Sequence, residues 1–280
     1  MKLRDALAQL EGVRACAGGY VARCPAHDDR NASLSLRERD SGKALFHCFA
    51  GCSFESIRDA LAGRPGRGAL GLPGSDPRPA LDDAKRTAFA RRIWRESSRA
   101  AGSLVEAYLR SRGIAIPPPP SLRFHPTLRH PTGVYAPAMV AAVQTEEQIV
   151  AVHRTYLKAD GSGKAALEPA KALLGPAAGA AIRFAKAGDV VVLAEGIETA
   201  LSVAQACPEM PVWAAISASL MSRTELPKCV RTVLIAADAD SAGDKAALQA
   251  AARFTREGRC VKIAKPHGAK DFNDILAGVA

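Results

Sequence analysis

The last third of the chain has the clearest hydrophobic pattern, in which short apolar runs alternate with longer amphipathic segments. Four apolar runs predict β-strands, at residues 190–194, 212–215, 232–236 and 260–264. Residues 197–206 and 242–257 lie between them and have the spacing of helices. Apolar strands that alternate with helices predict a parallel sheet covered on both faces. We therefore expect an α/β domain over residues 188–280.

The middle of the chain mixes helical and strand patterns. Residues 81–112 are arginine-rich with apolar positions at helical spacing, and four consecutive prolines, 117–120, end this helical segment. Residues 134–157 alternate and predict a β-hairpin or meander. These patterns indicate an α+β subdomain over residues 81–187. Before it, residues 63–80 are dominated by glycine and proline and predict a flexible linker, which separates a small first domain, residues 1–62.

Charge is distributed unevenly along the 280 residues. The formal net charge is +10, and residues 76–187 hold 17 basic and 9 acidic side chains, whereas residues 188–280 hold 10 and 11. This segregation favours a polyanionic partner such as nucleic acid. The sequence has no apolar run long enough to span a bilayer and no secretory pattern at its start, so a cytoplasmic protein without membrane association is expected. In that compartment clustered cysteines indicate a metal site rather than disulfides.

Four potential zinc ligands lie in two closely spaced pairs near the start of the chain. Cys24 and His27 are separated by two residues, Cys48 and Cys52 by three, and 20 residues lie between the pairs. Zinc prefers four sulfur and nitrogen ligands in a tetrahedral arrangement, and a short loop can supply two of these ligands. The segments 33–36 and 44–47 predict a hairpin that carries the second pair. His47 is a rival ligand, although strand alternation would point it away from Cys48. The other cysteines, expected to be buried free thiols, are Cys16, Cys207, Cys229 and Cys260.

The first of these segments resembles the zinc-binding domain at the front of bacterial and phage DNA primases. The resemblance rests on Cys-Pro-Ala-His-Asp-Asp-Arg at 24–30, Ser-Leu-Ser-Leu at 33–36 and Phe-His-Cys-Phe-Ala-Gly-Cys at 46–52. The last two cysteines are separated by three residues, and this spacing resembles that of the zinc-binding domain in primase-like proteins of phages and other mobile elements. The resemblance implies a zinc-ribbon-like domain with structural zinc that helps to engage a single-stranded template.

Acidic residues follow two of the predicted parallel strands. Glu195 comes directly after the first strand, and Asp238 and Asp240 follow the third. Groups just beyond the carboxyl ends of parallel strands gather in one crevice. Converging carboxylates repel unless a cation lies between them, and a cysteine-free carboxylate site suits magnesium. Gly196 and Gly243 are expected to allow close backbone approach at this site.

Residues 189–278 resemble the Toprim domain that primases, topoisomerases and certain nucleases share. The signatures are Glu195-Gly196 and Asp238-Ala239-Asp240. The resemblance implies a Rossmann-like parallel sheet, with Glu195 as the acid/base or metal-organising catalytic residue. It also implies that Asp238 and Asp240 hold catalytic magnesium or manganese.

Further site candidates come from the same resemblance and from the basic middle segment. Lys270-Asp-Phe-Asn-Asp274 resembles the end of phage and plasmid primase Toprim domains, which makes Asp271 and Asp274 second-rank candidates. Glu198 either corresponds to an acidic position of the family or is a negative charge that the helix dipole favours at the N-terminus of a helix. Ser241, three residues before Asp244, is predicted to cap the N-terminus of the next helix. Primases of the DnaG kind have a basic subdomain in the middle position. This resemblance makes three basic residues of the middle segment candidates for nucleic-acid binding, namely Arg154, Lys164 and Lys171.

Together these resemblances predict a DNA primase of a phage, plasmid or other mobile element. It would be a nucleotidyltransferase of DNA replication that makes short RNA primers on single-stranded DNA from nucleoside triphosphates. A separate replicative helicase or polymerase is the expected protein partner, because the chain has no Walker A motif. Two alternatives remain, a Toprim nuclease and a non-catalytic single-stranded DNA-binding mediator of the RecR kind. A topoisomerase is not expected, because no tyrosine has the context of a separate gate domain.

Overall fold

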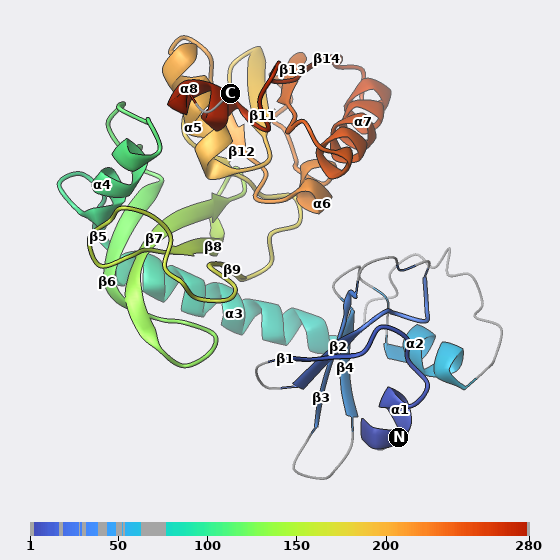
Figure 1. The fold of residues 1–280 in the computed structure, drawn as a ribbon. Helices are drawn as coiled ribbons and strands as arrows, with labels where there is room; N and C mark the ends of the chain where they lie inside the picture. The colour runs from blue at the N-terminus through green and yellow to red at the C-terminus, as the bar shows by residue number, and fades with distance from the viewer. Residues whose placement is uncertain are drawn as a thin grey trace. The chain divides into compact units, whose positions relative to one another are not determined.

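The computed structural model divides the chain into two compact units, Met1–Ser75 and Asp76–Ala280 (Figure 1). It describes residues 3–16, 19–27, 29, 32–38, 44–48, 52, 54–62 and 77–278, with the backbone alone for 77–82. Most of the predicted linker, residues 63–76, lies outside the described residues. Its last residues are helical, because helix α3 already begins at Pro77. No helix in the described parts of the chain combines the length and apolarity needed to cross a bilayer.

The first unit is a small antiparallel sheet with two short helices. The strands β1 (Arg14–Cys16), β2 (Gly19–Ala22), β3 (Leu34–Glu38) and β4 (Ala44–Cys48) pair in chain order. Helices α1 (Leu3–Leu7) and α2 (Phe54–Leu61) pack on this sheet. The predicted hairpin is confirmed, since Leu34 of β3 lies opposite Cys48 of β4. The core is small, and the side chains of Leu34, Leu36 and Ile57 fill it.

The second unit begins with a five-stranded antiparallel sheet. Its strands run in the order β5 (Ser98–Arg99), β6 (Leu122–Arg129), β7 (Tyr135–Gln144), β8 (Ile149–Tyr156) and β9 (Lys171–Leu174). Strands β7 and β8 confirm the predicted hairpin. Alternate residues of β7 face opposite ways. Val140 packs in a cluster with Ile93 of α3 (Pro77–Glu96), whereas Met139 packs in a cluster with Leu109 of α4 (Leu104–Ser111).

The expectation of one helical segment over 81–112 is wrong. Helix α3 ends at Glu96, β5 follows, and α4 starts afresh at Leu104. Gly102 takes a left-handed conformation with φ of +72°. The Ser103 hydroxyl then accepts a hydrogen bond from the Val105 backbone N–H, at 3.1 Å, and caps the new helix. Glycine and serine together thus turn the chain where apolar periodicity alone predicted continuity.

The C-terminal sheet has the strand order β10-β12-β11-β13-β14. Its strands are β10 (Ile182–Arg183), β11 (Val190–Ala194), β12 (Val212–Ala214), β13 (Thr232–Ala236) and β14 (Cys260–Ala264). The last four are parallel, which confirms the prediction, and β10 adds an unpredicted antiparallel edge. The other edge, β14, is largely exposed, so the expectation of a sheet covered throughout on both faces is wrong there.

Helices cover the two faces of this sheet. Helix α5 (Ile197–Ala206) lies against β11 and β12 and contacts α8 (Phe272–Ala277), while α7 (Ser241–Arg256) lies against β13 and β14. The short α6 (Ala218–Met221) contacts α7. These helices and the parallel strands form the α/β layers at the red end of the colour scale in Figure 1.

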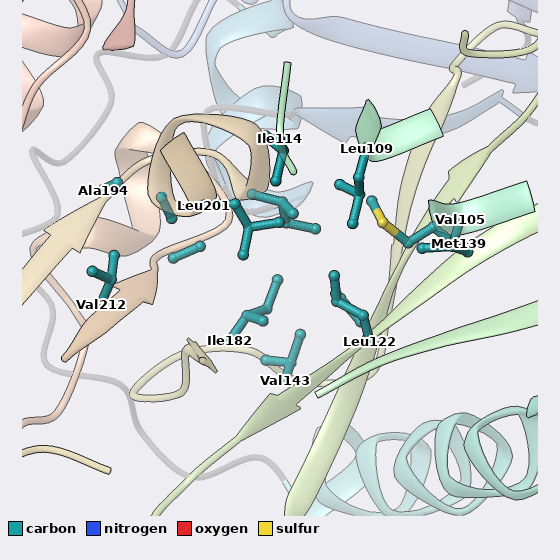
Figure 2. Close-up of a cluster of buried hydrophobic side chains, with 14 of the residues drawn as sticks. Val105, Leu109, Ile114, Leu122, Met139, Val143, Ile182, Ala194, Leu201 and Val212 are labelled. Atoms are coloured by element: carbon teal, nitrogen blue, oxygen red, sulfur yellow. The ribbon is translucent and has the colours of Figure 1, made fainter. Parts of the chain in front are cut away.

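One hydrophobic cluster joins the two halves of the second unit. Leu109 of α4 and Leu122 of β6 pack in the same cluster as Leu201 of α5 and Val212 of β12, as Figure 2 shows. Complete burial of a leucine side chain contributes about 1.5–3 kcal/mol relative to exposure. Apolar contacts therefore hold the antiparallel and parallel sheets together.

Candidate functional site

The zinc ligands predicted from sequence come together in the first unit. Among the described residues, one group of three or more His, Cys, Asp or Glu side chains has all its ligand atoms within 4.8 Å of one another: Cys24, His27, Cys48 and Cys52. The Nδ1 atom of His27 lies 3.2 Å from Sγ of Cys52 and 3.9 Å from Sγ of Cys48. Three thiolates and one imidazole at this spacing fit a tetrahedral zinc ion. His47 is exposed and is not a member of the group.

Asp29, which sequence reasoning missed, organises the first ligand pair. Its carboxylate accepts hydrogen bonds from the backbone N–H of Cys24 and the hydroxyl of Ser33, each at 2.6 Å. Burial opposes ionisation of Asp29, but these hydrogen bonds outweigh it and hold the pKa at about 2. The ionised carboxylate also lies 3.8 Å from Nε2 of His27. Such partners orient metal ligands, and the Asp-Asp after His27 was the available sequence signal.

Two cysteines of the cluster are more buried than any cysteine outside it, whereas Cys52 is half-buried. Cys24 and Cys48 are buried, and burial together with the neighbouring thiol of Cys48 raises the pKa of Cys24 to about 12. Binding of a metal would reverse this by stabilising the thiolate. The expectation that the remaining cysteines are buried is wrong. Cys207 is half-buried, and three are exposed: Cys16, Cys229 and Cys260. Cys16 and Cys260 are exposed because they lie on edge strands.

A cavity of about 150 Å³ opens at the carboxyl ends of β11 and β13 in the second unit. Four predicted acidic residues line it, namely Glu195, Glu198, Asp238 and Asp271. Glu195 follows β11 directly, and Asp238 lies two residues after β13. The topology thus produces the predicted crevice, since both strands end at the same edge of the sheet.

The acidic side of this cavity comprises Glu195, Asp238 and Asp271. Burial and the charges of Glu195, Asp271 and Asp240 together raise the pKa of Asp238 to about 6. Burial also raises the pKa of Glu195, with a contribution from the charge of Asp240. Carboxylates in this state favour binding of a cation, which removes their mutual repulsion. The described carboxylates do not converge as closely as the zinc ligands do.

Asp240 has a structural task beside the cavity and does not line it. It is the N-cap of α7, and its Oδ1 accepts a hydrogen bond from the Gly243 backbone N–H at 2.7 Å. The predicted cap at Ser241 is therefore wrong by one residue, because Ser241 is already the first residue of the helix. Asp240 still acts on the cavity through its charge, which raises the pKa of Asp238.

The acidic residues near the end of the chain fall into two groups. Asp271 caps α8 by accepting from the Asp274 backbone N–H at 2.8 Å, and it also lines the cavity. Asp274 itself points elsewhere, with its Oδ1 atom 4.0 Å from Nη2 of Arg112. Asn273 between them is fully buried and donates to the backbone carbonyl of Arg112 at 2.7 Å. The structure thus brings Asp271, but not Asp274, to the candidate site.

The two glycines expected to allow close approach behave differently. A Cβ on Gly243 would lie 2.5 Å from the backbone oxygen of Asp238, which no real Cβ tolerates. A Cβ on Gly196 would meet nothing closer than 3.8 Å, from Glu198 and Thr199. Only Gly243 is therefore required by the protein's own packing, whereas the space above Gly196 belongs to the cavity.

Basic residues also line the cavity, and together with Glu198 they make up its basic side. Lys164, Lys171 and Arg112 line it together with Glu198. Lys164 and Lys171 were predicted from sequence, whereas Arg112 was not, although it ends the arginine-rich segment 81–112. The third predicted nucleic-acid-binding residue does not join them. Arg154 is buried in β8 and donates to the hydroxyl of Tyr156 at 3.3 Å.

Comparison with known families now identifies the second half of this unit. Residues 190–279 match the model of the Toprim domain, which spans the strands and helices that carry Glu195, Asp238 and Asp271. This region is a Toprim domain. Residues 84–184 match the model named "Domain of unknown function (DUF7146)", so the antiparallel sheet precedes the Toprim domain as a separately recognised module. None of the curated proteins matches the chain.

Solved structures similar to the chain include DNA primases. The zinc-binding and RNA polymerase domains of the Aquifex aeolicus primase are 18% identical, over 99% of this chain and 80% of that chain, with a TM-score of 0.42. The primase fragment of the bacteriophage T7 primase-helicase is 17% identical, over 90% and 92%, with a TM-score of 0.41. A DNA primase domain from Pseudomonas aeruginosa is 16% identical, over 69% and 74%, with a TM-score of 0.45.

Proposed function

We propose that this protein is a DNA primase that synthesises short RNA primers on single-stranded DNA with magnesium or manganese. The observation that carries the proposal is that carboxylates and ammonium groups line one cavity. Glu195, Asp238 and Asp271 form its acidic side, and Lys164 and Lys171 belong to its basic side. A nucleoside triphosphate with its bound cation needs both kinds of charge in one place.

The chain's own residues divide the work of nucleotidyl transfer between them. Magnesium, when bound, supplies the positive charge that lets carboxylates and phosphates share one site. Asp238 and Asp240 are its proposed carboxylate partners. Glu195 has a raised pKa, which suits a group that assists removal of the proton from the primer 3′-hydroxyl. The lysines offer N–H donors to phosphate oxygens.

The remaining parts of the chain would supply the template and its context. The zinc-ribbon-like unit and the basic residues 76–187 are proposed to engage single-stranded DNA, because the positive charge is concentrated there. A separate helicase or polymerase of a phage, plasmid or other mobile element is the proposed partner. Binding through phosphate neutralisation should weaken steeply as salt concentration rises.

The proposal is tested with the full, zinc-loaded chain, several single-stranded DNA templates, labelled nucleotides and magnesium. The wild type should produce short oligonucleotides. Asp238→Ala and Glu195→Ala should lower the rate several hundred-fold, on the order of 3–4 kcal/mol of transition-state stabilisation, and keep DNA binding. Asp189→Ala is the matched control, because Asp189 is an exposed acid at the opposite end of β11.

Two outcomes would replace the proposal by the alternatives. Magnesium-dependent shortening of DNA without synthesis, lost in Asp238→Ala, would indicate a Toprim nuclease. Template binding with neither activity on any template would indicate a non-catalytic mediator.

A further inference from the structure

Glu198 lies inside the Toprim domain at the basic side of the cavity. It is 7% exposed, on the first turn of α5, and three donors from the preceding module surround its carboxylate. The Tyr108 hydroxyl donates to Oε1 at 2.5 Å, and Nζ of Lys164 lies 3.1 Å from the same oxygen. Nζ of Lys171 lies 3.4 Å from Oε2. Both carboxylate oxygens are therefore engaged by the protein itself.

The pKa of Glu198 is shifted in the opposite direction to the pKa values of Glu195 and Asp238. Burial raises the pKa of Glu198, but the charges of Lys171 and Lys164 and the hydrogen bond from Tyr108 hold it far below its usual range. By contrast, the pKa of Asp238 is raised, and the cause includes neighbouring carboxylates. A cation would approach Asp238 favourably, whereas two ammonium groups repel it from Glu198. Glu198 is thus unsuited to hold magnesium.

The two lysines keep donors that Glu198 does not use. Each ammonium group has three N–H donors, and the side chains of Lys164 and Lys171 remain 35% and 41% exposed where they line the cavity. His153 in β8 lies behind them; burial and the charge of Lys171 lower its pKa to about 4, so it is neutral near pH 7. The group therefore has two positive charges and one negative charge, and its net positive charge faces the cavity.

We propose that Glu198 is a positioning residue that holds Lys164 and Lys171 as a binding surface for the phosphates of a metal-bound triphosphate. The inference rests on the proposed function for the identity of that ligand. Glu198 lies on α5, whereas both lysines belong to the preceding module, so the interaction joins the two halves of the site across their common core. Tyr108 completes the arrangement from α4 by fixing the Glu198 carboxylate.

The test measures calorimetric binding of inorganic tripolyphosphate, with magnesium, to the full zinc-loaded chain. Glu198→Gln removes a negative charge from an anion-binding cavity, so simple electrostatics predicts tighter binding. A positioning role predicts the reverse, a loss of about tenfold, because the lysines lose their fixed partner. Lys164→Met with Lys171→Met should also lose binding, and adding Glu198→Gln to this pair should have little further effect. Glu209→Gln, at an exposed position, should bind like the wild type.

A second measurement separates positioning from metal ligation. Magnesium affinity without the anion should fall in Asp238→Asn and stay unchanged in Glu198→Gln. Tyr108→Phe keeps the ring in the core and provides a milder variant if Glu198→Gln does not fold; it should weaken tripolyphosphate binding in the same direction. Unchanged or tighter anion binding in both variants, or loss of magnesium binding in Glu198→Gln, would overturn the inference. Because no polymerisation is measured, failure of the primase assay leaves this result interpretable.

Discussion

Gly243 lies so close to Asp238 that a Cβ on the glycine would come within 2.5 Å of the aspartate backbone oxygen. The substitution Gly243→Ala should therefore displace the loop that carries Asp238 and cost about 1–3 kcal/mol of stability. We expect a large loss of primer synthesis with retained binding to single-stranded DNA. Steady-state assays and urea unfolding measure these two effects.

The control for this substitution is Gly188→Ala. A Cβ there would meet no atom within 4 Å, and the backbone is not left-handed. Equal losses of activity in the two variants would show that the close approach at Gly243 is not what places Asp238.

The raised pKa of Asp238 predicts a pH-dependent stability of the magnesium-free protein. Because the folded-state pKa of about 6 lies above the ordinary aspartate pKa of 3.8, its stabilising contribution is complete below about pH 4 and is lost as the pH rises through about 6. Asp238→Asn should remove this loss and be about 1–2 kcal/mol more stable than the wild type at pH 8, after allowance for solvent screening, but not at pH 4.

Urea unfolding followed by tryptophan fluorescence tests this prediction, because both tryptophans, Trp94 and Trp213, lie in the second unit. Asp189→Asn is the control at an exposed carboxylate. If the difference in unfolding free energy between Asp238→Asn and the wild type were the same at pH 4 and pH 8, the expected effect of Asp238 protonation on stability would be contradicted.

Asp240 allows its capping and charge contributions to be separated. Asparagine caps a helix almost as well as aspartate, so Asp240→Asn should keep stability within a few tenths of a kcal/mol. Asp240→Ala should lose about 0.5–2 kcal/mol. If the carboxylate also binds the cation, both variants should lose magnesium affinity and primer synthesis. Full activity in stable Asp240→Asn protein would restrict Asp240 to capping α7.

The cysteine cluster predicts one tightly bound zinc per chain. Cys24→Ala and Cys48→Ala should lose the metal and unfold the first unit, whose small core needs it. Tryptophan fluorescence of the second unit should stay unchanged, because its cores are formed by other residues. Cys16→Ala is the matched control, since Cys16 is exposed in the same unit. Elemental analysis that finds full zinc in Cys24→Ala and Cys48→Ala would refute the ligand assignment.

Local patterns in the sequence were sufficient for the parallel strands and for the clustering of the zinc ligands. The apolar runs predicted β11, β13 and β14 at the bounds that the structure has. These elements follow from burial and from short ligand spacing, which act within a few residues. Adjacent strand ends then placed Glu195 and Asp238 in one cavity, as the topology of parallel sheets requires.

Interactions between distant segments were decided only by the tertiary structure. Whether Glu198 binds metal or simply begins a helix could not be read from its neighbours in sequence, because its partner Tyr108 lies 90 positions away. The sequence likewise could not tell which of two nearby aspartates belongs to the site. Asp271 lines the cavity, whereas Asp274 faces Arg112. Sequence thus determined which residue types follow which strands. Only packing of the two sheets around a common core brought the lysines to the carboxylate, because charge pairing across modules depends on that core and not on local pattern.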